Sequence, residues 1–141
     1  MKRKYKKGLV FGCFDIPHYA HLKYIDKCLS YVQELNVGLM SDDFISKKKG
    51  HPRPFFDFSE RRGMLRDFNR DLNVKFCDND EQKALINSIK PDVILLPADD
   101  FDGRLSEILG YFDEIFFDIV KVDMSGSVST TKILNRIKEN I

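Results

Sequence analysis

The sequence predicts an α/β domain, doubly wound, with a mainly parallel five-stranded sheet and helices on both faces. Short and fully apolar runs such as residues 93–96 alternate with segments of helical periodicity, and strands that are buried on both faces have this character. The length of 141 residues and the 43% hydrophobic content fit a single core. No repeat of fixed period divides the chain.

The first half of the chain alternates strand and helix and then breaks into a loop. Residues 8–11 are expected to form a strand, and apolar side chains at spacings of three and four predict a helix over residues 19–32. Residues 37–40 form the second expected strand. Residues 41–57 contain three successive lysines, a glycine and two prolines, so we expect a long loop that is mobile when empty and closes over a ligand.

The next two elements are bounded by capping residues. Ser59 is expected to cap a helix that continues to Phe68, and residues 74–77 form the third strand. Asp80 is the expected N-cap of a helix over residues 81–89.

The last third of the chain contains two further strands. Pro91 ends the preceding helix and residues 93–96 form a strand. A short helix over residues 105–109, a fifth strand over residues 114–117 and a final helix over residues 130–140 complete the predicted fold. Right-handed crossovers between parallel strands then place helices on both faces of the sheet.

Charge excludes one class of partner. The chain has 23 basic and 22 acidic residues, but five of the first seven residues are basic. We therefore separate a basic N-terminal tail over residues 1–7 from the domain over residues 8–141. Because the domain alone is net acidic, we expect no nucleic-acid partner.

Membrane insertion and disulfide bonding are also not expected. No apolar run approaches the ~20 residues of a membrane span, and Asp15 interrupts the only stretch that follows a basic start, as a secretory signal does. The three cysteines are odd in number and lack a CxxC pair, which argues against a disulfide framework and a zinc site. These features predict a cytoplasmic protein.

Two histidines follow the first strand at the expected start of a helix. His18 and His21 are three residues apart, which places them on one helix face, and a helix start offers free N–H groups to an anion. Phosphate binding explains this geometry. The pair alone fits equally well an N-cap and a surface residue, and the segment lacks the further ligands of a metal site.

Hydroxyl and lysine clusters add to this pattern. The hydroxyls are Ser129, Thr130 and Thr131, and the lysines are Lys47, Lys48 and Lys49. Each cluster alone fits helix capping or a solvated surface. Two helix starts and a cationic loop together suit a triphosphate.

Several stretches in this order resemble the small cytidylyltransferases of the HxGH nucleotidyltransferase superfamily, most closely the bacterial glycerol-3-phosphate cytidylyltransferases. They are GCFDIPHYAH at residues 12–21, SERR at 59–62, EQK at 81–83, DDFDG at 99–103 and VSTTKI at 128–133. The resemblance implies a Rossmann-like domain that transfers a cytidylyl group from CTP to a small alcohol phosphate and releases pyrophosphate. Glycerol 3-phosphate would give CDP-glycerol, a precursor of cell-surface polysaccharide. Mg²⁺ or another divalent cation carried by the nucleotide and a homodimer are also implied.

The resemblance also implies roles for individual residues. The catalytic residues are His18, His21 and Lys48. The nucleotide-binding residues are Cys13, Phe14, Asp99, Asp100, Ser129, Thr130 and Thr131. The residues that bind the second substrate are Lys47, Lys49, Arg61 and Lys83, and no residue is expected to bind the metal directly.

Departures from the family pattern leave alternatives open. Ala20 and Ala98 stand where the family has glycine, and residues 121–127 lack the family's arginine, with Met124 at the matching place. The GHPRP pattern at residues 50–54 resembles the heptose-phosphate, ethanolamine-phosphate and flavin-forming branches, and Arg53 within it is a candidate substitute for the missing arginine. An adenylyltransferase of the same superfamily, or a nucleotide-binding protein without activity, therefore remains an alternative.

Overall fold

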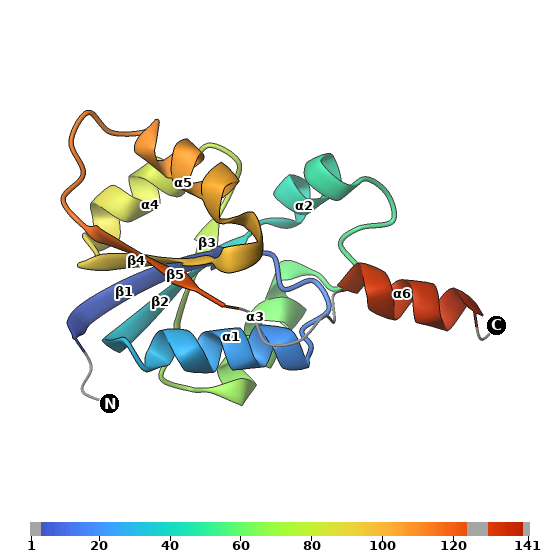
Figure 1. Cartoon of the computed structure of the whole chain (residues 1–141). Helices are drawn as coiled ribbons and strands as arrows, with labels where there is room; N and C mark the ends of the chain where they lie inside the picture. Colours follow the sequence, from blue (N-terminus) through green and yellow to red (C-terminus); the bar gives the residue numbers. More distant parts are fainter. Residues whose placement is uncertain (1–3, 124–129, 140–141) are drawn as a thin grey trace.

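The computed structural model describes residues 4–123 and 130–139, whose strands form one five-stranded parallel sheet in the order β3-β2-β1-β4-β5 (Figure 1). The strands are β1 (Tyr5–Gly12), β2 (Val32–Met40), β3 (Asn73–Cys77), β4 (Val93–Pro97) and β5 (Asp118–Val122). The helices are α1 (Tyr19–Leu29), α2 (Asp42–Lys49), α3 (Phe58–Phe68), α4 (Gln82–Ile89), α5 (Phe101–Leu109) and α6 (Thr130–Glu139), with a 3-10 turn at Ala98–Asp100. The predicted α/β fold is confirmed.

Helices cover both faces of the sheet (Figure 1). α1 and α3 lie on one face, where Ile25 and Leu65 belong to the same buried cluster as Val37 of β2. α4 and α5 lie on the other face, where Ile86 and Ile108 belong to a second buried cluster. The sheet is therefore the middle of three layers.

The central strand β1 supplies apolar side chains to both clusters. Leu9 and Phe11 belong to the cluster under α4 and α5, whereas Val10 belongs to the cluster under α1 and α3. All three side chains are buried. This two-sided burial explains why the strand is an unbroken apolar run in the sequence.

The sheet opens between β1 and β4 toward the carboxyl ends of the strands. The two strands pair at two positions, Gly8 with Val93 and Leu9 with Ile94. Beyond these pairs, the hydroxyl of Tyr24 from α1 donates to the carbonyl of Leu95 at 3.3 Å. The strand order also reverses here, and ligands of doubly wound sheets bind at such a switch point.

The predicted loop over residues 41–57 is wrong in its first half, which forms α2. The Ser41 hydroxyl caps this helix by accepting a hydrogen bond from the backbone N–H of Phe44 at 3.0 Å, and Ile45 is fully buried. Two aspartates lie in the first turn and three lysines in the last, which suits the helix dipole. α2 therefore forms without an apolar stripe, because its charges suit the helix dipole and one buried side chain anchors it to the core.

The predicted fifth strand over residues 114–117 is also wrong, because β5 begins at Asp118. Phe117 is buried in the core under α4 and α5, while Phe116 is half exposed, and their rings pack edge to face at 5.1 Å. This aromatic turn precedes the strand. Pairing with β4 begins where Asp118 meets Val93.

Smaller differences concern element ends. β1 begins at Tyr5, so residues 5–7 belong to the sheet and not to a tail. Asp57 caps α3 in place of Ser59, through a capping box with Glu60. Glu81 takes the N-cap position of α4 that was expected for Asp80.

Candidate functional site

A polar cavity of about 210 Å³ lies at the carboxyl edge of the sheet, where β1 and β2 end. Its walls are formed by Gly12, Cys13, Met40, Phe44, Lys48, Gln82, Asp100, Gly103, Arg104 and Glu107. These residues come from β1 and the position after it, from β2, α2, α4 and α5, and from the 3-10 turn at Ala98–Asp100, so six elements meet around the cavity. A volume below the ~300–1,000 Å³ of drug-sized sites suits a small polar ligand.

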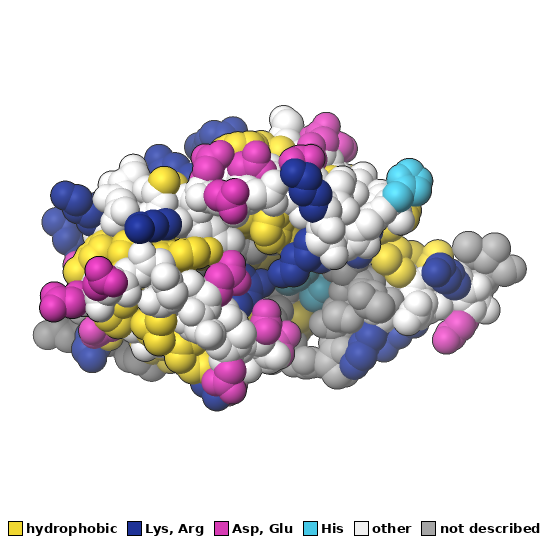
Figure 2. Space-filling model, turned by 90° about the horizontal axis from the view of Figure 1, so that it is seen from above, with side chains coloured by type: hydrophobic (Ala, Val, Ile, Leu, Met, Phe, Trp, Pro, Cys, Tyr) yellow, Lys and Arg dark blue, Asp and Glu magenta, His cyan; other side chains and the backbone are white. Residues whose placement is uncertain are grey.

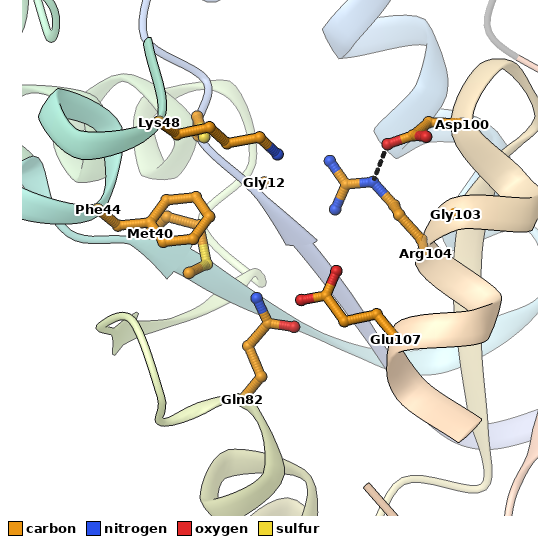
Figure 3. Close-up of a pocket in the computed structure, with 10 residues that line it drawn as sticks. Gly12, Met40, Phe44, Lys48, Gln82, Asp100, Gly103, Arg104 and Glu107 are labelled. Carbon is orange, nitrogen blue, oxygen red and sulfur yellow. Dashed lines mark ion pairs between the residues drawn. The ribbon is translucent and has the colours of Figure 1, made fainter. Parts of the chain in front are cut away.

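Opposite charges line this cavity (Figure 3). Lys48 from α2 and Arg104 from α5 reach toward each other from opposite walls, while Gln82 and Glu107 point into the same space. Arg104 Nε lies 3.4 Å from a carboxylate oxygen of Asp100. Lysine and arginine side chains also gather in the hollow at the middle of this face of the molecule (Figure 2). The cavity thus offers cations for an anionic group, and hydrogen-bonding groups for hydroxyls.

The two histidines stack at the start of α1. Their ring centroids are 3.8 Å apart with the planes inclined by 22°, and His18 occupies the N-cap position. Burial lowers the pKa of His18 below its usual value. Burial, the neighbouring His18 and the charge of Lys49 lower the pKa of His21 to about 4. Both rings are therefore neutral near pH 7.

Three of the four imidazole nitrogens of the pair have no hydrogen-bond partner in the described part of the chain. Both ring nitrogens of His18 and Nδ1 of His21 are buried without a hydrogen-bond partner among the described residues. A buried polar nitrogen without a partner costs roughly 1–3 kcal/mol. A ligand that offers oxygens to these nitrogens would remove that cost.

A tight turn separates the histidine pair from the cavity. Gly12 and Cys13 line the cavity, whereas the ring of Phe14 contacts His21 edge to face at 5.2 Å. Phe14 adopts φ of +46°, in the left-handed region, and a side chain at Gly12 would collide with its ring. The turn therefore requires glycine, and it places backbone between the two halves of the site.

The three lysines of α2 point into different surroundings. Lys47 pairs with Asp43 at 3.0 Å on the exposed side of the helix. Lys48 lines the cavity, with Nζ 5.5 Å from the centroid of the Phe44 ring. Burial lowers the pKa of Lys49, and the charge of Arg53 acts in the same direction. The lysines thus cannot act as one cationic patch.

Arg61 does not fit its expected contact with substrate, because its side chain is fully buried. The guanidinium donates to the carbonyls of Cys13 and Met40, both at 2.8 Å, and of Phe56 at 3.0 Å. It also pairs with Asp42 at 2.6 Å. Arg61 therefore joins the end of β1, the end of β2, α2 and the segment before α3.

The remaining predicted residues are dispersed. Asp99 and Asp100 follow β4, and only Asp100 lines the cavity. Lys83 is exposed on α4, with Nζ 5.8 Å from the centroid of the Phe112 ring, and it is not part of the cavity wall.

The hydroxyl cluster is only partly described. Thr130 and Thr131 begin α6, whereas Ser129 and Met124 lie outside the described residues.

Sequence reasoning missed four polar residues that the fold brings to this edge, namely Asp15, Gln82, Arg104 and Glu107. It recognised Arg53 only as a substitute for a missing arginine. The signal for Asp15 was present, because its carboxylate comes three residues after the end of an apolar strand. Arg104 and Glu107 carried no such signal, since exposed charges on a short helix are ordinary.

The described residues do not provide a cage for a metal ion. No group of three or more His, Cys, Asp or Glu side chains in the described ranges is placed to hold one. In many enzymes Mg²⁺ keeps several waters and binds through substrate phosphates, without such a group of protein ligands.

None of the helices in the described ranges has the length and apolar character needed to cross a membrane.

A parallel α/β sheet with a neutral histidine pair and a charged, polar cavity at its carboxyl edge is typical of ligand-binding domains of the doubly wound class. The chain belongs to the cytidylyltransferase-like family, which it matches over residues 9–136. Membership places it in the nucleotidyltransferase superfamily.

Curated relatives include bifunctional HldE proteins. The protein from Campylobacter jejuni subsp. doylei is 36% identical over an alignment of 141 positions that covers 99% of this chain and 29% of the relative. The protein from Aliarcobacter butzleri is 33% identical over an alignment of 136 positions that covers 95% of this chain and 28% of the relative. The chain therefore spans less than a third of the length of these relatives.

Solved structures share the fold. A lipopolysaccharide core biosynthesis protein from Thermoplasma volcanium superposes with a TM-score of 0.70 at 21% identity, covering 86% of this chain and 99% of that protein. A bifunctional NMN adenylyltransferase/ADP ribose pyrophosphatase from Francisella tularensis gives a TM-score of 0.69 at 14% identity, covering 97% of this chain and 43% of that protein.

Proposed function

We propose that this domain transfers a nucleotidyl group from a nucleoside triphosphate to a small phosphorylated acceptor and releases pyrophosphate. The observation that carries the proposal is the stacked pair His18 and His21, whose buried nitrogens lack partners in the described structure. The pair lies at a helix start on the switch-point edge, where phosphate groups bind in such folds.

The reaction requires no nucleophile from the protein. An oxygen of the acceptor phosphate attacks the α-phosphorus, a new phosphorus–oxygen bond forms, and the bond to the leaving pyrophosphate breaks. Charge accumulates on the oxygens around the α-phosphorus, and ring N–H groups of His18 and His21 are suited to donate to them. Catalysis then consists of positioning and electrostatic stabilisation.

The cavity is the proposed site of the acceptor. Lys48 and Arg104 supply positive charge for the phosphate, while Gln82 and Glu107 supply hydrogen-bonding groups for hydroxyls. A small polyhydroxylated phosphate satisfies both requirements. Glycerol 3-phosphate with CTP is the first pair that we propose, as the family resemblance implies.

ATP with a sugar phosphate is the second candidate pair. The GHPRP pattern at residues 50–54, which resembles the heptose-phosphate branch, favours it. The similarity to HldE proteins over almost the whole chain points in the same direction. For either pair we propose that Mg²⁺ enters with the nucleotide and that a homodimer acts in the cytoplasm.

The test is pyrophosphate release across a matrix of substrates. CTP, ATP, GTP and UTP are each combined with glycerol 3-phosphate and a panel of sugar phosphates. Pyrophosphate release that requires both substrates supports the proposal. A preference for ATP would favour the second substrate pair over the first and leave the reaction class unchanged. Tight nucleotide binding without release for any acceptor would instead indicate a binding protein without activity.

Variants of the three histidines sharpen the test. H18A and H21A are expected to lower turnover by two or more orders of magnitude, or roughly 3 kcal/mol of transition-state stabilisation. H51A is the matched control, because His51 is exposed in the segment after α2. Equal activity of all three variants would refute the role of the pair.

A further inference from the structure

A buried ion pair holds the segment after α2 against the turn after β1. The Asp15 side chain is fully buried and accepts a hydrogen bond from Arg53 Nε. It also accepts from the backbone N–H of Phe55 at 2.7 Å and of Phe56 at 3.1 Å. Arg53 is thereby fixed in one place, and its guanidinium also lies 5.1 Å from the centroid of the Phe55 ring.

One nitrogen of this guanidinium is buried without a hydrogen-bond partner. That atom is Nη2 of Arg53, which has no partner in the described part of the chain, and only 11% of the side chain is exposed. Asp15 already accepts three hydrogen bonds and does not reach Nη2 with one. Burying part of a charged group without full hydrogen bonding is costly, so a ligand that accepts from Nη2 would offset this cost.

The surroundings of Arg53 favour an anion. Arg53 is held near the histidine pair, because its partner Asp15 precedes His18 by three residues in the chain. Burial lowers the pKa of Lys49, and the charge of Arg53 acts in the same direction. The charge of Lys49 in turn lowers the pKa of His21, after burial and His18. The unpartnered atoms of Arg53, His18 and His21 are all nitrogens. Nitrogen donors and cations without a matching acceptor are complementary to phosphate oxygens.

We propose that Arg53 is a ligand of the nucleotide's phosphate chain, held in place by Asp15, with Nη2 presented to a phosphate oxygen beside the histidine pair. This inference rests on the proposed function and deepens it. It also accounts for a departure in the sequence, since residues 121–127 contain no arginine. The segment after α2 supplies the guanidinium instead.

The test is calorimetric titration of the intact chain with inorganic tripolyphosphate and with the active nucleoside triphosphate. R53Q is expected to weaken binding of both by about tenfold or more, since it removes a charge-assisted contact. R53K keeps the charge without the planar fork and is expected to lie between R53Q and the unaltered chain. R62Q is the matched control, because Arg62 is exposed on α3.

Steady-state kinetics separates a ligand from a structural residue. A ligand role predicts that R53Q raises KM for the nucleotide and leaves KM for the acceptor unchanged, whereas loss of local structure would change both. D15N keeps a polar side chain and is expected to weaken tripolyphosphate binding less than R53Q. Tripolyphosphate affinity of R53Q or R53K equal to that of R62Q, or no tripolyphosphate binding by the unaltered chain, overturns the inference.

Failure of the proposed function gives a different result. If no substrate pair releases pyrophosphate, the transferase proposal fails, and the tripolyphosphate titration still decides whether Arg53 binds phosphate. If R53Q is not folded, as shown by the lack of a cooperative unfolding transition, the tripolyphosphate affinity of R53K relative to R62Q decides the outcome.

Discussion

Replacing Arg61 by methionine is expected to destabilise the domain strongly. The guanidinium satisfies three backbone carbonyls, those of Cys13, Met40 and Phe56, and its side chain is fully buried. Methionine fills similar space but leaves these carbonyls without their donor, at about 1 kcal/mol or more each. The three carbonyls together give a loss of about 3–5 kcal/mol in the free energy of unfolding.

Urea denaturation monitored by circular dichroism measures this loss. The same change corresponds to a fall of about 10–20 °C in Tm for a domain of this size. R62M on the same helix is the control, expected to remain within about 0.5 kcal/mol because Arg62 is exposed. D42N is expected to cost under about 1 kcal/mol, since the Asp42 side chain is 45% exposed. A loss below about 1 kcal/mol for R61M would refute the structural role and restore Arg61 as a candidate for substrate binding.

Three further predictions concern titration, the switch point and the acceptor. Because folding lowers the pKa of His21 to about 4, the unfolded chain binds more protons than the folded chain between about pH 6.5 and pH 4, and the free energy of unfolding falls as the pH drops through this range. H21Q is expected to remove up to about 1.4 kcal/mol per pH unit from this pH dependence, as measured by urea denaturation at several pH values. Y24F removes the bond to the buried Leu95 carbonyl and is expected to cost about 1 kcal/mol by thermal unfolding, unlike Y19F at an exposed position. K48A is expected to raise KM for the acceptor about tenfold or more, whereas K47A changes it less than about twofold, because Lys47 pairs with Asp43 outside the cavity.

Each of these has an outcome that contradicts it. An unchanged slope in H21Q would mean that His21 titrates normally in the folded state, and H51Q serves as its control. Equal stability of Y24F and Y19F would show that the hydrogen bond from Tyr24 to the Leu95 carbonyl does not stabilise the fold. Equal kinetics of K48A and K47A would contradict the proposal that the acceptor binds in the cavity.

The sequence by itself determined the class of fold and one half of the site. The apolar runs over residues 8–11 and 93–96 fall within the two central strands, because burial on both faces leaves a local, unbroken apolar signal. His18 and His21 were placed at a helix start, since helical periodicity and Pro17 are also local signals.

Only the tertiary structure decided which charges are buried and which line the cavity. Arg61 meets the Cys13 carbonyl across 48 positions of the chain, and Arg53 meets Asp15 across 38. Lysines 47, 48 and 49 are adjacent in the sequence, yet a helix turns each side chain into different surroundings. Periodicity describes neighbours along the chain, whereas burial of a charge depends on the segments that pack against it from elsewhere. For this reason the cavity and the burial of both arginines emerged only from the fold.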